Sequence, residues 1–389
     1  MIDRTAGVTA AQGFVAAGVA AGLRRSGKKD LAVVVSQGPR WTAAGVFTSN
    51  RFSAAPVRWS RRVLRDGALR AVVLNSGCAN ACTGAQGEVD AARMAELTAA
   101  RLGCPVGEVG VASTGLIGQY LPMAQVESGI ALGVAALTGD GGAAAAEAIR
   151  TTDTVSKQAS VSSPAGWVVG GMAKGAGMLA PGLATMLVVL TTDADLTGLD
   201  VDAVLAGACR VSFERADSDG CMSTNDSVYL LANGASGIVP DAGEFERALT
   251  AVAIDLAQQL IADAEGARHA IAVTVEAAAT EADALEVARA VARSNLFKCA
   301  IAGNDPNWGR VLAAVGTTGA GFDPADVSVG FNGLSVFRRG QPGDDRDQVD
   351  LSGFDVAVTI DLAAGGASAT IWTNDLTHEY VAINADYSS

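Results

Sequence analysis

Histidine is scarce in this sequence, which has two residues of this type, His269 and His378. Neither lies at a metal-ligand spacing from another histidine, a cysteine or a carboxylate, so a zinc site is not expected. A Ser-His-Asp triad would need one of these histidines, yet the chain lacks the G-x-S-x-G sequence that would present the serine. The G-x-x-x-x-G-K-[ST] sequence of a phosphate-binding loop is also absent. We therefore interpret both histidines as partly exposed polar residues.

Positive charge, long apolar runs and paired cysteines are also lacking. The chain has 28 Lys and Arg residues against 41 Asp and Glu, and its formal charge of -13 disfavours binding to nucleic acid. No segment reaches the roughly 18 apolar residues of a membrane span. The apolar stretch at 13–23 follows Asp3 and precedes "RRSGKK", which does not fit a signal peptide. The six cysteines form no C-x-x-C pair, which indicates reduced thiols and a cytoplasmic location.

The pattern along the chain indicates an α/β protein of more than one domain. Its 389 residues suffice for two or three domains, and β-rich runs alternate with Ala-rich helical patterns. We expect mixed sheets in layers, with a main α/β domain at 1–270 and a smaller C-terminal α/β domain at 271–389. Thr280 is expected to cap a helix together with Asp283. Strands are predicted at 31–36, 68–77, 108–113, 227–234, 270–278, 327–331, 354–361 and 368–373, and helices at 87–103, 123–137, 141–150, 198–210 and 242–262.

A glycine-rich loop leads directly into an apolar run in "GMAKGAGMLAPGLATMLVVLTTDA" at 171–194. Its "GAGMLA" matches G-x-G-x-x-A, the loosest dinucleotide-binding pattern. However, Pro181 and Gly182 would break the helix that this pattern requires. Thr185 stands at the junction of loop and strand. The simplest interpretation is a β-branched residue that starts a strand after a turn.

A second interpretation makes Thr185 a nucleophile. Without a usable histidine, an acyl-transferring enzyme needs another base, and the α-amino group of an N-terminal threonine can serve. The unperturbed pKa of this amine is about 7.7–8.0, close to the operating pH. Because Thr185 is internal, its hydroxyl would first attack the Ala184 carbonyl, and hydrolysis of the resulting ester would cut the chain. Spacing alone favours the simpler interpretation.

Several motifs in a fixed order change this balance. They are "NSGCANACTG" at 75–84, "STGLIG" at 113–118, "KGAGMLAPGLATML" at 174–187, "DGCMSTNDS" at 219–227, "DPNWGR" at 305–310 and the terminal "INADYSS". Together they resemble the ornithine acetyltransferase (glutamate N-acetyltransferase) family, including its self-cleavage segment. The resemblance implies an N-terminal-nucleophile type of fold, a layered mixed-sheet sandwich with helices outside. The chain departs from the usual family pattern at Cys78, Ala176, Gly182 and Leu183.

The resemblance also implies roles for individual residues. Thr185 is the expected nucleophile, released by cleavage after Ala184 into chains 1–184 and 185–389. Thr114 and Gly115 match the oxyanion site, where a hydroxyl and a backbone N–H would meet the developing negative charge. The residues that match substrate contacts are Lys174, Thr151 or Thr152, Glu265, Asn384 and Ser389, together with Thr185.

The implied reaction is ping-pong acetyl transfer in arginine biosynthesis. N-acetylornithine acetylates Thr185, ornithine leaves, and glutamate takes the acetyl group to give N-acetylglutamate. No metal or organic cofactor is implied, and use of acetyl-CoA as a co-substrate stays open. The two cleaved chains are expected to form an α2β2 heterotetramer. The alternatives are an N-terminal-nucleophile aminopeptidase or amidase, which passes the acyl group to water, and a non-catalytic binding protein.

Overall fold

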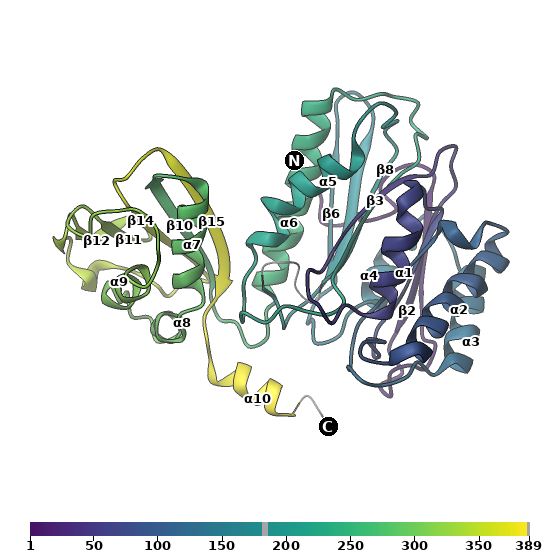
Figure 1. Ribbon diagram of the computed structural model, residues 1–389, viewed down its shortest axis with the longest axis horizontal. Coiled ribbons are helices and arrows are strands. Elements are labelled where there is room, and N and C mark those ends of the chain that lie inside the picture. Colours follow the sequence, from purple (N-terminus) through teal and green to yellow (C-terminus); the bar gives the residue numbers. More distant parts are fainter. Residues whose placement is uncertain (181–185, 387–389) are drawn as a thin grey trace. The chain divides into compact units, whose positions relative to one another are not determined.

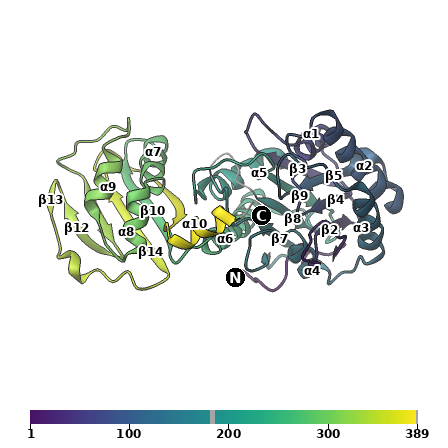
Figure 2. The same cartoon turned by 90° about the horizontal axis from the view of Figure 1, so that it is seen from below.

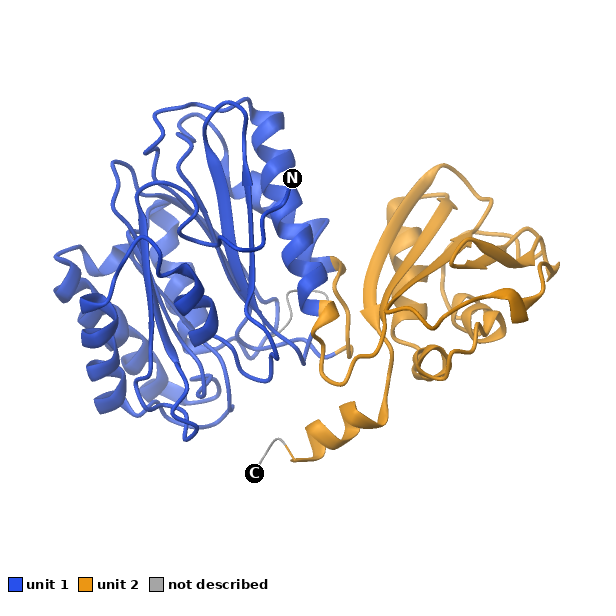
Figure 3. Ribbon diagram, turned by 180° about the vertical axis from the view of Figure 1, so that it is seen from behind, with its two compact units in different colours: residues 1–214, 221–260 blue, residues 215–220, 261–389 orange. Residues whose placement is uncertain are grey.

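The computed structural model describes residues 1–180 and 186–386 (Figure 1). The chain divides into two compact units, drawn in different colours in Figure 3. Unit 1 comprises Met1–Glu214 and Cys221–Leu260, and unit 2 comprises Arg215–Gly220 and Ile261–Ser389. The boundary expected after residue 270 falls within unit 2. Both units combine helices with sheets of mixed strand direction, so the predicted α/β class is confirmed.

The described residues of unit 1 form two sheets. The first has the strand order β1-β2-β4-β5, with β4 and β5 parallel and the other neighbours antiparallel. The second has the order β3-β9-β8-β7-β6, with β8 and β9 parallel and the other neighbours antiparallel. The strands are β1 (Phe14–Val19), β2 (Leu31–Ser36), β3 (Thr42–Phe47), β4 (Ala71–Asn75), β5 (Val109–Ser113), β6 (Lys157–Ser162), β7 (Val168–Lys174), β8 (Leu187–Thr192) and β9 (Ser227–Ala232).

The two sheets of unit 1 share a core, and helices cover their other faces. Strand β8 is buried along its whole length, and its side chains alternate between two clusters. Leu187 and Val189 pack with residues of the first sheet, whereas Val188 and Leu190 pack with α5 and α6. Helices α2 and α3 lie side by side against the first sheet (Figure 2). The helices are α1 (Ala55–Val63), α2 (Gly84–Leu102), α3 (Met123–Ala135), α4 (Gly142–Ala148), α5 (Val201–Arg210) and α6 (Ala242–Ala262).

Unit 2 is built on one sheet with the strand order β13-β12-β11-β14-β10-β15. Helix α7 packs along β10 and β15 and begins at the predicted cap, where the Thr280 hydroxyl accepts a hydrogen bond from the Asp283 N–H at 3.1 Å. The elements are β10 (Ala270–Ala278), α7 (Glu281–Ala292), α8 (Asn295–Ala302), α9 (Trp308–Val315), β11 (Ser328–Phe331), β12 (Leu334–Arg338), β13 (Gln341–Pro342), β14 (Asp355–Asp361), β15 (Ala367–Asn374) and α10 (His378–Asp386). Within 1–180 and 186–386, no helix has the length and apolar character needed to span a membrane.

Candidate functional site

Thr114 and Gly115 form a tight turn at the end of β5. Thr114 is 1% exposed, and its N–H donates to the Asn75 carbonyl at 3.0 Å. Gly115 has a φ of +129°, and a Cβ at this position would lie 2.3 Å from the Gly77 carbonyl carbon and 2.6 Å from the Cys78 nitrogen. Only glycine fits this backbone. The turn therefore holds the two expected oxyanion residues in one constrained geometry.

Lys174 joins two of the predicted residues. It ends β7 and is 1% exposed, and its Nζ donates to the Thr151 hydroxyl at 2.8 Å and to the Thr114 hydroxyl at 3.2 Å. A buried ammonium group needs such acceptors. Thr151, rather than Thr152, supplies the hydroxyl in this contact. Because both hydroxyl oxygens accept from Lys174, each hydroxyl proton is directed to another acceptor.

Asp153 is a member of this cluster that sequence reasoning missed. One carboxylate oxygen accepts from Lys157 Nζ at 2.7 Å and from the Gly175 N–H at 2.7 Å, and the other accepts from the Thr151 N–H at 3.0 Å. Burial raises the pKa of Asp153, but the charges of Lys174 and Lys157 outweigh it and hold this pKa well below its usual range. A carboxylate two residues after Thr151 and four before Lys157 was the available signal. Asp153 therefore fixes the segment that carries Thr151.

Two further predicted residues meet within unit 2. Asn384 lies on α10, and its Nδ2 donates to Glu265 Oε2 at 2.8 Å. Glu265 is 9% exposed, so this amide replaces part of the water that an exposed carboxylate would bind. Ala184, Thr185 and Ser389 lie outside the described residues. The structure thus brings Thr114, Thr151 and Lys174 together in unit 1, and Glu265 and Asn384 together in unit 2.

The prediction for one histidine is wrong. His378 is exposed, but His269 is only 6% exposed. Its Nδ1 lies 2.9 Å from the Asp375 carboxylate and its Nε2 lies 3.0 Å from the Leu351 carbonyl. Tertiary contacts that the sequence does not show thus bury this ring inside unit 2. Among residues 1–180 and 186–386, no cluster of three or more His, Cys, Asp or Glu is suited to a metal ion.

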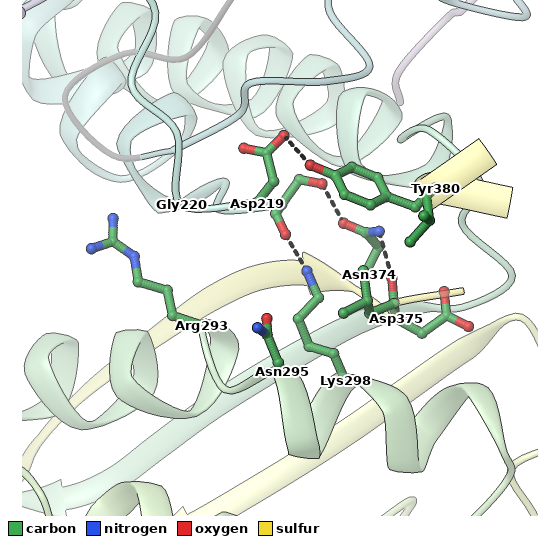
Figure 4. Close-up of a pocket in the computed structure, with 11 residues that line it drawn as sticks. Asp219, Gly220, Arg293, Asn295, Lys298, Asn374, Asp375 and Tyr380 are labelled. Carbon is green, nitrogen blue, oxygen red and sulfur yellow. Dashed lines mark hydrogen bonds between the residues drawn. The ribbon is translucent and has the colours of Figure 1, made fainter. Parts of the chain in front are cut away.

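Unit 2 also contains a pocket of about 290 Å³ that is lined by several polar and charged residues (Figure 4). The loop at 218–220, the start of α8 and residues 374–376 and 380–381 line it. Lys298 is 5% exposed and donates to the Ser218 carbonyl, and the Tyr380 hydroxyl donates to Asp219 Oδ2 at 3.5 Å. Burial lowers the pKa of Lys298, against the opposing charges of Asp219 and Asp217. Of the predicted site residues that the structure describes, none lines this pocket.

Comparison with known proteins identifies the family. The ArgJ family matches residues 15–389. The arginine biosynthesis bifunctional protein ArgJ of Streptomyces avermitilis is 60% identical over 382 residues, which cover 98% of this chain and 100% of that protein. The protein of the same name from Streptomyces coelicolor is 58% identical with the same coverage. A crystal structure of ornithine acetyltransferase complexed with ornithine, from Mycobacterium tuberculosis, is 51% identical and matches 48% of this chain and 99% of that chain, with a TM-score of 0.46. The family match and the two Streptomyces relatives confirm the resemblance: the chain belongs to the ArgJ family and is an acyltransferase.

Proposed function

We propose that this chain cuts itself between Ala184 and Thr185 and then transfers acetyl from N-acetylornithine to glutamate through an acetyl-Thr185 ester. The observation that carries the proposal is the buried contact of Lys174 with the Thr114 and Thr151 hydroxyls. Lys174 ends the strand that leads into the loop before Thr185. This contact joins an expected oxyanion residue to two expected substrate residues, in a chain that belongs to the ArgJ family.

The proposed chemistry needs two activated groups. Cleavage frees the α-amino group of Thr185, whose ordinary pKa of about 7.7–8.0 suits it to take the hydroxyl proton. As the hydroxyl oxygen attacks the acetyl carbonyl, negative charge develops on the carbonyl oxygen. The Thr114 hydroxyl and the Gly115 N–H are the proposed donors to this oxygen. Because Lys174 donates to the Thr114 oxygen, it polarises that hydroxyl and strengthens it as a donor.

The same site serves both half-reactions. The acetyl–nitrogen bond of N-acetylornithine breaks, the acetyl group forms an ester with Thr185, and the ornithine amine leaves with a proton. The glutamate amine then attacks the ester, and Thr185 recovers its proton. Lys174 suits the carboxylate of either amino acid, and Glu265 suits the amine at the far end of ornithine. No metal or organic cofactor takes part in this scheme, and the cytoplasmic location and α2β2 assembly are further predictions.

Ornithine release from N-acetylornithine, measured with and without glutamate, tests the transfer. We expect glutamate to accelerate release, because it consumes the acetyl-enzyme. Equal rates would instead indicate the aminopeptidase or amidase alternative, with water as acceptor. A parallel assay with acetyl-CoA and glutamate shows whether the chain also uses that donor.

Cleavage is tested separately on the purified protein. We expect two bands on a denaturing gel and a new N-terminus that reads Thr-Met-Leu. Thr185→Ala should give one uncut, inactive chain, because it removes the attacking hydroxyl. A single intact band from active wild-type protein would contradict the proposed nucleophile, and an intact inactive protein would favour the non-catalytic binding alternative.

A further inference from the structure

The motif "DGCMSTNDS" at 219–227 contributes no residue to the proposed chemistry, yet two of its side chains hold the proposed site together. Asp226 is fully buried and directly precedes β9. Its Oδ1 accepts the Met186 N–H at 3.0 Å. Met186 follows Thr185 in the sequence, so this N–H belongs to the peptide bond that joins the two. Asp226 therefore binds the backbone one residue after the proposed nucleophile.

Asn225, the neighbouring residue, binds the backbone next to the proposed oxyanion turn. It is 3% exposed, and its Nδ2 donates to the Ala79 carbonyl at 2.6 Å and to the Ser113 carbonyl at 2.8 Å. Ser113 is the last residue of β5 and precedes Thr114. One dipeptide thus binds the residue before the oxyanion turn and the residue after the nucleophile. All of these residues belong to unit 1.

The surroundings of Asp226 favour a neutral carboxylic acid. Within the described residues, no group donates a hydrogen bond to its Oδ2. The nearby Thr48 hydroxyl gives its proton to the Ser223 carbonyl at 2.6 Å. Burial raises the pKa of Asp226 well above its usual range and outweighs the opposing effects of the bond from Met186, the Thr48 hydroxyl, the charge of Lys174 and the Ser223 hydroxyl. A neutral acid accepts the Met186 N–H as an asparagine side chain would.

We infer that Asn225 and Asp226 are a pair of positioning residues. Together they fix the chain beside Thr185 and the turn at Thr114 and Gly115 in position relative to each other. The inference rests on the proposed function. Its physical basis is that displacing reacting groups by about 1 Å can cost on the order of 100-fold in rate. Among the described residues, both act on the proposed site through backbone groups, which are the Met186 N–H and the Ser113 carbonyl.

The first experiment follows self-cleavage by denaturing gel and mass spectrometry. Asp226→Ala removes the acceptor and should slow cleavage about 100-fold. Asp226→Asn keeps it and should cleave close to the wild-type rate. The matched control is Asp193→Ala, at the opposite end of β8, where a fully buried aspartate accepts the Gln12 and Val168 N–H groups. This control should lower the melting temperature but leave the cleavage rate unchanged.

Three results would overturn the inference. Asp226→Ala that cleaves like the wild type would show that the contact positions nothing. If Asp226→Asn cleaves as slowly as Asp226→Ala, the carboxyl group acts by transferring a proton and not by holding the peptide N–H of Met186. If the wild type forms no Thr-Met-Leu terminus, the proposed function is overturned as well. This outcome separates a failure of the proposed function from a failure of the positioning inference alone.

The second experiment uses cleaved enzyme and stays informative if Asp226→Ala does not fold. Asn225→Ala should lower kcat for acetyl transfer about 10- to 100-fold at unchanged KM, because the oxyanion turn loses its anchor. Its control is Asn233→Ala, after the far end of β9, where a buried asparagine makes two backbone hydrogen bonds. We expect that control to keep the wild-type kcat. Equal kcat for wild type and Asn225→Ala would overturn the pairing.

Discussion

At the scale of single residues, the site in unit 1 depends on how buried charges are distributed. Lys174 and Lys157 are both inaccessible, and the Asp153 carboxylate beside them stays ionised. Asp226, close enough to Lys174 to feel its charge, has the opposite shift, because burial dominates there. The pKa values of two aspartates in one unit thus shift in opposite directions, and each aspartate supports a different part of the chain.

Lys174→Met should weaken acetyl transfer without preventing folding, since Asp153 keeps its bonds to Lys157 and Gly175. A charge-assisted hydrogen bond is worth about 2 kcal/mol, which corresponds to roughly a 30-fold lower kcat/KM. Steady-state kinetics with N-acetylornithine measure the effect. Lys29→Met, which changes an exposed lysine before β2, is the control, and an unchanged kcat/KM in Lys174→Met would remove Lys174 from the site.

Asp226 makes a prediction about pH and stability. Its raised pKa means that the folded chain keeps a proton that the unfolded chain loses above the ordinary aspartate pKa of about 3.9. The wild type should therefore lose stability relative to Asp226→Asn as the pH rises through this window. The difference in unfolding free energy should grow by about 1.4 kcal/mol per pH unit and level off above the raised pKa.

Denaturant unfolding between pH 4 and 7 measures this difference, with both proteins in the Thr185→Ala background so that the chain stays uncut. A difference that does not change with pH would show that Asp226 titrates normally in the folded chain.

At the scale of elements, the ends of strands carry the site. Gly115 follows β5, Lys174 ends β7, Met186 precedes β8 and Asp226 precedes β9. Gly115→Ala should lower turnover by about 100- to 1,000-fold, since its Cβ would collide with the backbone at Gly77 and Cys78 and displace an oxyanion donor. Acetyl-transfer assays on folded protein measure the loss.

Gly103→Ala provides the matched control for that variant. Gly103 caps α2 at a φ of +65°, and a Cβ there would meet no atom within 4 Å. We expect a loss of about 1 kcal/mol in stability and normal turnover. If both glycine variants lose the same activity, the turn at Gly115 has no special role.

Elements with a strong local pattern were predictable from the sequence, and the others were not. The run "LAVVVS" at 31–36, apolar up to its last residue, is β2, and the helix predicted at 242–262 is α6. Strand β6 was missed, because "KQASVS" is polar and becomes buried only through its pairing with β7. Helix α1 was missed because its sequence, "APVRWSRRV", contains a proline and three arginines.

The same distinction applies to the site. Motifs named Thr114, Lys174 and Glu265 as candidates, but the contact of the Lys174 ammonium group with Thr151, rather than with Thr152, is visible only in the fold. Asp153 and Asp226 are short acidic residues in loops, a pattern typical of solvated turns. Only the fold shows that both are buried.

At the scale of the whole molecule, the proposed cut would divide the strands of a single sheet between two chains. In the order β3-β9-β8-β7-β6, strands β3, β7 and β6 belong to residues 1–184, and β9 and β8 belong to residues 185–389. Two strands of the second fragment thus lie between strands of the first. Strand β9 pairs with β3 on one side, and β8 pairs with β7 on the other.

The cut protein should therefore behave as one particle until it unfolds. We expect one species by native size exclusion and two fragments only after denaturation, with a single cooperative thermal transition for unit 1. The hydrogen bonds between β7 and β8, from Val169 with Thr192 to Lys174 with Leu187, resist separation. Fragments that part in native buffer would contradict this.

The interleaved strands also have a genetic consequence. The two fragments of one polypeptide should stay associated with each other, because neither can dissociate without disrupting the sheet that they share. A cell with two gene copies, one damaged before codon 185 and one after it, should therefore not regain activity by swapping halves between finished molecules.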